Sequence, residues 1–449
     1  DPTSSVFTVD NHTWVNNSGD TYVAYLFAHN DGDGGFGPSG DQDIIKCGSF
    51  TSDGSGLATV DVGFEPQWVL YKASTAATHW SIADSMRGFV ADTASASGKY
   101  LNANSSSAEL SNAPVGLTST GFKYNSAPNI GFIYIAIRRG PLAPPESGTE
   151  VFDVDTRGST GDGDAPELRS GFPVDAVIYT QNKNSVGNKT RAISRLTGTN
   201  YMHTNLTNAE SSISSYVSDY MNGFGSGTNT DAQDIGWMFR RAPSFFDVVA
   251  YTGDGTYPRN IAHNLGATPE MVIVKARNWA SGSWATHHKD LGYSTVSYLD
   301  NTLGSASQPH FLTASDASTF TVGSATSFSN YSNSASYNYI AYLFATLPGV
   351  SKVGSYTGNG TSQTIDCGFT SGARLVLIKS TSTTGDWLIA DTERGIVAGS
   401  DPYLELNTTN AEVTSEDWLD PDSSGFIVNE VSGSNANTSG VSYIFYAIA

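Results

Sequence analysis

The chain of 449 residues is long enough for several domains, and its formal net charge is −20. So acidic a surface repels nucleic acid and anionic membranes, and no apolar run is long enough to span a bilayer, so we expect neither a nucleic-acid partner nor membrane insertion. Glycine is frequent, with 46 residues, and helix-favouring residues are scarce, which favours an all-β fold of short strands.

The first 30 residues match only the end of a longer unit that recurs later in the chain. The stretch "SSVFTVDNHTWVNNSGDTYVAYLFA" resembles "ASTFTVGSATSFSNYSNSASYNYIAYLFA", which occupies residues 317–345. We therefore expect residues 1–30 to be the closing strands of an upstream repeat, whose front part precedes this sequence.

An acidic, glycine-rich loop, "NDGDGGFGPSGDQD", follows at residues 30–43. Calcium prefers six to eight oxygen ligands, and glycine lets a loop fold tightly around the ion. This pattern predicts a cation site, with calcium as the one cofactor that the sequence suggests, formed by Asp31, Asp33, Asp41 and Asp43. The alternative is a solvated turn, since Asp and Gly are ordinary turn residues.

From there the chain repeats itself four times. Marker glycines stand at equivalent places, followed each time by an apolar run such as "WVLYKA" or "LVLIKS". Each unit holds alternating runs rich in Val, Ile, Tyr and Phe, bounded by Gly, Asn and Ser. We therefore predict tandem antiparallel β-sandwiches, jelly-roll-like, of about 100 residues each. The predicted units are 31–145, 146–243, 244–348 and 349–449.

A tryptophan recurs inside three of these units, with a glycine eight residues later. "HWSIADSMRGF", "SWATHHKDLGY" and "DWLIADTERGI" contain Trp80, Trp284 and Trp387. A catalytic residue is seldom needed three times in one chain, so we predict that these indoles are markers of the sandwich core. Asp84 with Arg87, and Asp391 with Arg394, are predicted to be ion pairs that fix a loop.

The motif "YLNANSSSAE" and its counterparts supply the candidate ligand-binding residues. An aromatic ring flanked by amides is typical of a sugar platform. These residues are Tyr100, Asn102, Asn104, Tyr201, Asn205, Tyr403 and Asn407. The alternative is strand packing, and the recurring glutamates, Glu109, Glu210 and Glu412, are predicted to be structural.

The order "GF-P--V-IK … W-I-D--RG … YL--N---AE … GF … YI-YAIA" resembles a repeat domain of phage structural proteins, found in tail fibres and other virion proteins, notably of marine phages. The resemblance covers almost the whole chain but brings no catalytic residues with it. It implies a place in the virion, other virion proteins as partners, and a homo-oligomer, of which a trimer is one form.

The leading functional hypothesis is therefore a non-enzymatic virion protein, a tail or head fibre that contacts a host-surface glycan or protein. A capsid decoration or cement protein is the first alternative, and a polysaccharide-binding or depolymerising enzyme module is the second. The sequence contains no G-x-S-x-G elbow, Walker loop or H-E-x-x-H motif.

Overall fold

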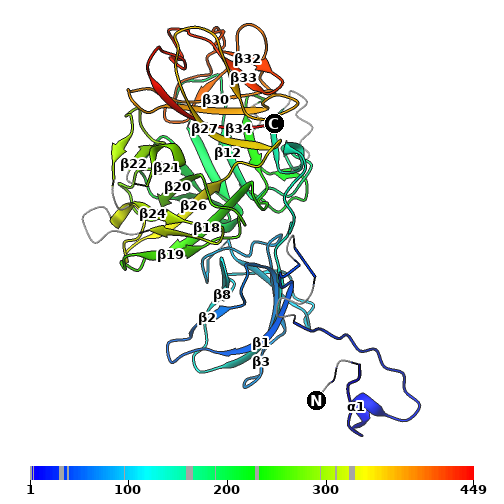
Figure 1. Cartoon of the computed structure of the whole chain (residues 1–449). Coiled ribbons are helices and arrows are strands. Elements are labelled where there is room, and N and C mark those ends of the chain that lie inside the picture. Colours follow the sequence, from blue (N-terminus) through cyan, green and yellow to red (C-terminus); the bar gives the residue numbers. More distant parts are fainter. Residues whose placement is uncertain are drawn as a thin grey trace.

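The computed structural model describes residues 3, 5–29, 35–37, 40–95, 97–157, 165–187, 189–227, 232–293, 295–308, 311–322 and 329–449. Within these residues the fold is all-β, as predicted, and its single α-helix, α1 (Thr13–Asn16), has four residues (Figure 1). No helix in the described part of the chain is long and apolar enough to cross a membrane.

Unit 1 is a two-layer sandwich. Its larger sheet has six strands in the order β1-β9-β3-β4-β5-β6, and its smaller sheet has the order β2-β8-β7. All pairings are antiparallel. The strands are β1 (Ile45–Thr51), β2 (Leu57–Asp61), β3 (Pro66–Ala73), β4 (Ser81–Asp84), β5 (Lys99–Asn102), β6 (Leu110–Ser111), β7 (Val115–Thr118), β8 (Gly121–Asn125) and β9 (Gly131–Arg138).

Unit 2 repeats this plan with a shorter second layer. Its larger sheet has the order β10-β17-β12-β13-β14-β15, and its smaller sheet is β11-β16. The strands are β10 (Phe152–Thr156), β11 (Leu168–Arg169), β12 (Ala176–Thr180), β13 (Thr190–Ser194), β14 (Asn200–His203), β15 (Ser211–Ser212), β16 (Gly223–Phe224) and β17 (Ile235–Phe239).

Unit 3 has the complete set of sheets, β18-β26-β20-β21-β22-β23 and β19-β25-β24. Its strands are β18 (Phe246–Thr252), β19 (Arg259–Ala262), β20 (Met271–Ala276), β21 (Ala285–His288), β22 (Thr295–Tyr298), β23 (Ala306–Ser307), β24 (Leu312–Ser315), β25 (Thr319–Val322) and β26 (Asn338–Phe344).

Unit 4 has a five-stranded sheet, β27-β34-β29-β30-β31, and a three-stranded sheet, β28-β33-β32. A single bridge, Tyr403 to Val413, stands where the other units have a sixth strand. Its strands are β27 (Ser351–Thr357), β28 (Gln363–Asp366), β29 (Leu375–Ser380), β30 (Trp387–Asp391), β31 (Leu404–Glu405), β32 (Leu419–Asp422), β33 (Gly425–Val428) and β34 (Ser442–Ile448).

The larger sheets of units 2 to 4 are buried on both faces, which explains their nearly continuous apolar runs. In β29, Val376 and Ile378 point into the sandwich of unit 4, where they belong to its own core. Leu375 and Leu377, on the opposite face, belong to a second core that also holds residues of units 2 and 3. We call this second face of each larger sheet, turned away from the smaller sheet, the ring face.

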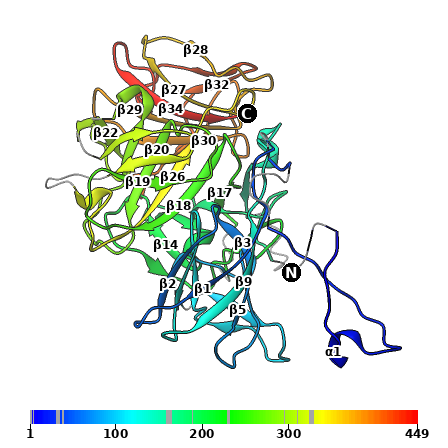
Figure 2. The same ribbon diagram turned by 60° about the horizontal axis from the view of Figure 1, so that its bottom comes forward.

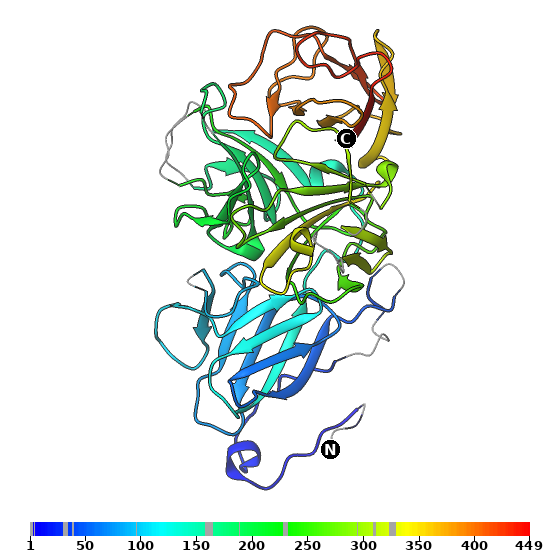
Figure 3. The ribbon, with the colours of Figure 1, turned by 90° about the vertical axis from the view of Figure 1, so that its left-hand side faces the viewer.

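Units 2, 3 and 4 are grouped together, and unit 1 lies at one end of the molecule (Figures 1 and 3). The segment 5–29 runs away from the four sandwiches and forms no strand in its described residues (Figure 2). The sequence predicted closing strands here, and the difference has a physical cause. The equivalent strand, β26, lies between β18 and β20, and no strand of the described residues pairs with residues 22–28.

Candidate functional site

Two loops of each unit meet the neighbouring units. The first loop links the third and fourth strands of the larger sheet and covers residues 74–80, 181–189, 277–284 and 381–386 in units 1 to 4. The second loop follows the next strand and covers residues 103–109, 204–210, 299–305 and 406–412. In units 2 to 4, each first loop lies against the second loop of another unit.

The same backbone hydrogen bond marks all three of these contacts. Glu210 N donates to Arg277 O at 2.6 Å between units 2 and 3, and Ser305 N donates to Thr381 O at 2.8 Å between units 3 and 4. Glu412 N donates to Lys183 O at 2.7 Å between units 4 and 2. The three units therefore form a closed ring, which the spacing of the repeats along the chain did not predict.

The tryptophan of the repeat belongs to this ring. Trp284 Nε1 donates to His203 O of unit 2 at 3.0 Å, and Trp387 Nε1 donates to Tyr298 O of unit 3 at 2.8 Å. Both side chains are 1% exposed, whereas Trp80 is 37% exposed. The prediction of three sandwich-core indoles was therefore wrong in its location: Trp284 and Trp387 are buried between units, and no other unit lies against the first loop of unit 1 in the described part of the chain.

The predicted ion pairs are present and extend further than expected. Arg87 Nε lies 3.0 Å from Asp84 Oδ2, and Arg394 Nε lies 2.7 Å from Asp391 Oδ2. The second nitrogen of each arginine reaches the recurring glutamate, Glu109 at 3.0 Å and Glu412 at 3.3 Å. In unit 4, Glu412 also pairs with Lys183 of unit 2, so this motif helps to close the ring.

The predicted ligand-binding residues lie in three of the four sandwich units, units 1, 2 and 4, and do not form one common surface. Tyr403 and Asn407 are buried, Tyr100, Asn102, Tyr201 and Asn205 are half-buried, and Asn104 is exposed. Two of the amides have a structural role: Asn104 Oδ1 accepts from Trp80 N at 2.9 Å, and Asn407 Oδ1 accepts from Trp387 N at 2.8 Å. The second loops of units 2 and 4 are covered by neighbours, so among the described residues of this motif the loop of unit 1 alone stays open to a partner.

The predicted calcium loop is described in part. Asp31 and Asp33 lie outside the described residues. Asp43 Oδ2 lies 3.9 Å from Lys46 Nζ, and its carbonyl accepts from Arg138. No group of three potential metal-binding side chains occurs in the residues that the structure describes, including Asp41 and Asp43. The cation site stays a prediction.

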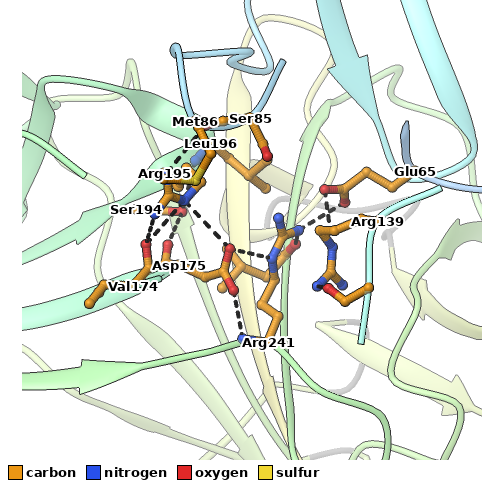
Figure 4. Close-up of polar contacts among 12 residues, drawn as sticks. Glu65, Ser85, Met86, Arg139, Val174, Asp175, Ser194, Arg195, Leu196 and Arg241 are labelled. Carbon is orange, nitrogen blue, oxygen red and sulfur yellow. Dashed lines mark hydrogen bonds and ion pairs between the residues drawn. The ribbon is translucent and has the colours of Figure 1, made fainter. Parts of the chain in front are cut away.

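A buried ionic cluster joins unit 1 to units 2 and 3 (Figure 4). Arg241, near the end of unit 2, places Nη1 2.8 Å from Glu65 Oε2 of unit 1 and Nε 3.5 Å from Asp175 Oδ1. Arg139 Nε lies 3.4 Å from Glu65 Oε1 and Arg195 Nε 3.7 Å from Asp175 Oδ1. Asp247 of unit 3 completes a set of three carboxylates and three guanidinium groups.

The two carboxylates respond differently to this environment. Burial raises the pKa of Glu65, against the opposing effect of Arg241 and Arg139. Burial also acts to raise the pKa of Asp175, but Arg241, Arg139 and Arg195 outweigh it and hold that pKa below its ordinary value. Because each charge has an opposite partner, the cluster is a structural contact between units rather than a site with a free reactive group.

An open groove of about 540 Å³ lies between units 3 and 4. Six Ser and Thr residues line it, together with Asp290, Leu291 and Ile444, whereas the rings of Tyr356 and Tyr443, which stack at 4.9 Å, belong to the core of unit 4. The hydroxyl residues are Ser305, Ser355, Thr357, Thr381, Ser382 and Ser442. The volume is that of an ordinary small-ligand site, and the groups suit a neutral, hydroxyl-rich ligand.

Sequence reasoning missed this groove because its lining comes from two units. Asp290 and Ser305 belong to unit 3, and Tyr356 lies on β27 of unit 4, an edge strand. In the sequence, single hydroxyl residues scattered between Ser305 and Ser442 cannot be told from ordinary solvent-exposed residues. These residues line one groove because units 3 and 4 are neighbours in the ring.

The comparison with known families gives one match. The family described as a domain of unknown function (DUF7483) matches residues 1–141 and 173–449. No curated protein shows significant similarity to the chain.

Proposed function

The chain belongs to the DUF7483 family of domains of unknown function, and from that premise we propose that it is a non-enzymatic structural protein of a phage virion that binds a host-surface glycan in the groove between units 3 and 4. The observation that carries this proposal is the groove itself, an open space of about 540 Å³ lined by Ser and Thr residues, one carboxylate and the apolar residues Leu291 and Ile444. The phage setting rests on the motif order described above.

The groove chemistry fits an oligosaccharide. Sugar hydroxyls exchange their bonds to water for bonds to Ser and Thr hydroxyls and to a carboxylate, while Leu291 and Ile444 offer contacts to the apolar C–H faces of the sugar. Ser355 and Thr357 lie on the edge strand β27, and both are exposed. A short extended ligand can therefore lie along this edge.

Binding is favoured over hydrolysis by the groups in the groove. Glycoside hydrolysis uses two carboxyl groups flanking the scissile bond, about 5–10 Å apart. Of the described residues that line the groove, Asp290 alone carries a carboxylate. The closed ring of units 2 to 4 suits a fibre or coat module that holds a binding surface in place.

The test is binding of the labelled full chain to an array of purified bacterial surface polysaccharides. We expect binding to at least one neutral glycan, lost in Ser355→Trp, which fills the groove, and weakened in Asp290→Asn. Thr364→Trp is the matched control, because Thr364 is an exposed residue of the same unit on the smaller sheet. No binding to any glycan, or equal binding by Ser355→Trp, would contradict the proposal.

A second experiment addresses the virion. Antibodies against the chain should label phage particles at fibres or at the coat, and labelling should disappear when the antibodies are preincubated with the purified chain. Phage lysates in which the chain sediments apart from the particles would remove the virion setting while leaving the glycan result unaffected.

A further inference from the structure

Unit 1 exposes the sheet face that units 2 to 4 bury inside their ring. In unit 4, six apolar side chains of the ring face are almost fully buried: Leu375, Leu377, Ile389, Ile444, Tyr446 and Ile448. Strand register identifies their counterparts in unit 1, because Leu70 pairs with Ile82 and Ile135 as Leu377 pairs with Ile389 and Tyr446. The face of unit 1 is equally apolar.

Its side chains are nevertheless open to solvent. Ile133 is 43% exposed and Trp80 is 37% exposed. The other five members of the face are half-buried, whereas residues on the opposite face of the same strands are buried in the core of unit 1. They are Trp68, Leu70, Ile82, Ile135 and Ile137. Contiguous apolar surface of this kind marks an interaction site.

Both loops of the ring contact are also available in unit 1. Lys275 and Lys379 each donate to a carbonyl in the second loop of the preceding unit, Thr207 O at 2.8 Å and Thr302 O at 3.0 Å. The equivalent Lys72 donates to Thr78 O of its own first loop. The exposed second loop of unit 1 offers the carbonyl that corresponds to these two, that of Ser106.

We propose that unit 1 forms the same ring with unit 1 of two other copies of the chain, so that the protein is a homotrimer held by a second ring of sandwiches. This proposal does not depend on the proposed function. The partner of this face is another copy of the chain because units 2, 3 and 4 already close a ring on one another, which leaves the ring face of unit 1 without a neighbouring unit among the described residues.

Unit 1 is complementary to itself at the positions that the ring uses. The recurring acceptors are backbone carbonyls, so any unit can supply them: Trp80 Nε1 would donate to Asn102 O, and Lys72 Nζ to Ser106 O, of the adjacent copy. The recurring backbone bond would run from Glu109 N to Ser74 O. Glu109 is already paired with Arg87, so no unpaired charges meet at this contact.

This contact closes a ring of three copies. A contact between two different surfaces forms a ring when its rotation divides a full turn, and otherwise it forms a filament. The same pair of loops closes after three units within one chain. Three copies of unit 1, joined in the same way, therefore leave neither loop open.

The first test is the mass of the full chain by light scattering over a range of concentrations. We expect three times the 47.5 kDa of one chain, and loss of the trimer in Trp80→Ala and in Ile133→Asp. Leu57→Asp is the matched control, because Leu57 is equally exposed in unit 1 but lies on the smaller sheet. This variant should remain trimeric, and circular dichroism should show all variants folded.

The second test locates the contact. Co-expressed chains carrying Ser74→Cys and Glu109→Cys separately should form a disulfide between chains, and neither variant alone should do so. The native Cys47 is common to every sample and so cannot account for a difference between them. A chain that stays monomeric at all concentrations, or a trimer that survives both Trp80→Ala and Ile133→Asp, would overturn the proposal and assign this face to another occupant.

Discussion

Trp237 of unit 2 donates its indole N–H to Asp391 of unit 4, with 2.8 Å between Nε1 and Oδ2. Asp391 also holds Arg394, whose guanidinium lies 5.3 Å from the centre of the Trp237 ring. All of these groups are buried, and they join two units that are separated in the chain by the whole of unit 3. This contact closes the ring.

Removing that single donor should weaken the ring. In Trp237→Phe the aromatic ring stays but Asp391 Oδ2 loses one of its two donors and keeps Arg394 Nε, so we expect a loss of about 1–3 kcal/mol in the free energy of unfolding, the contribution of one hydrogen bond to a buried carboxylate. Trp418→Phe is the control, because Trp418 is equally buried and its N–H meets no acceptor among the described residues. Chemical denaturation followed by circular dichroism compares the two, and equal losses would mean that the hydrogen bond contributes nothing.

The recurring tryptophans give a second prediction, from one substitution at two equivalent positions. Trp387→Ala empties a buried site between units 3 and 4 and should cost about 3–5 kcal/mol. Trp80→Ala, in dilute monomeric protein, should cost about 1 kcal/mol or less, because its ring is already partly in water. Thermal melting of the two variants measures the difference. Similar losses at both positions would mean that the indole stabilises its own sandwich rather than the ring.

The sequence predicted the sandwiches because their signals are local. Alternating runs such as "WVLYKA", turn glycines and the recurring Asp–Arg pair each act within one unit, so the all-β class, the four repeats and the Asp84–Arg87 and Asp391–Arg394 pairs could be read directly. A strand buried on both faces also reads as apolar, but its sequence does not say what covers the second face.

The ring and the groove could not be predicted for that reason. The sequence around Trp284 and Trp387 would look the same whether the indole packs inside its own sandwich or donates to a carbonyl of the neighbouring unit, as it does here. The exposed Trp80 shows that position in the assembly, rather than position in the repeat, decides burial. Likewise, Asp290 and Tyr356 meet at one groove only because units 3 and 4 are neighbours in the ring.

The ionic junction supplies a third prediction. Glu65→Gln leaves Arg241 and Arg139 with one carboxylate fewer in a buried cluster, and breaking a buried pair in this way costs about 3–5 kcal/mol. We expect unit 1 to loosen from units 2 and 3, seen as faster proteolysis near residues 140–147 and a larger radius of gyration. Asp254→Asn, which removes the partly exposed pair with Arg259, should cost less than about 1 kcal/mol and is the control. An unchanged radius in Glu65→Gln would show that apolar contacts alone hold unit 1.

The last prediction concerns pH and a buried carboxylate of unit 4. Asp401 accepts backbone hydrogen bonds from Val397 and Leu419, both of which lower its pKa. Burial outweighs them and, with Asp417 and Asp420 nearby, raises the pKa of Asp401 to about 6. The native state therefore keeps this proton to a higher pH than the unfolded chain does. The stabilisation is fully present below about pH 4 and is lost as the pH rises through about 6.

Unit 4 should accordingly gain stability as the pH falls from 7 to 5, by on the order of 1 kcal/mol, relative to Asp401→Asn, which has no such proton to gain. Asp417→Asn removes part of the repulsion and should move the transition of the wild-type residue to lower pH. Free energies of unfolding measured between pH 4 and 8 for the three proteins check this. If the difference between wild type and Asp401→Asn stayed constant over that range, the carboxylate would have an ordinary pKa, because its two backbone hydrogen bonds would balance its burial.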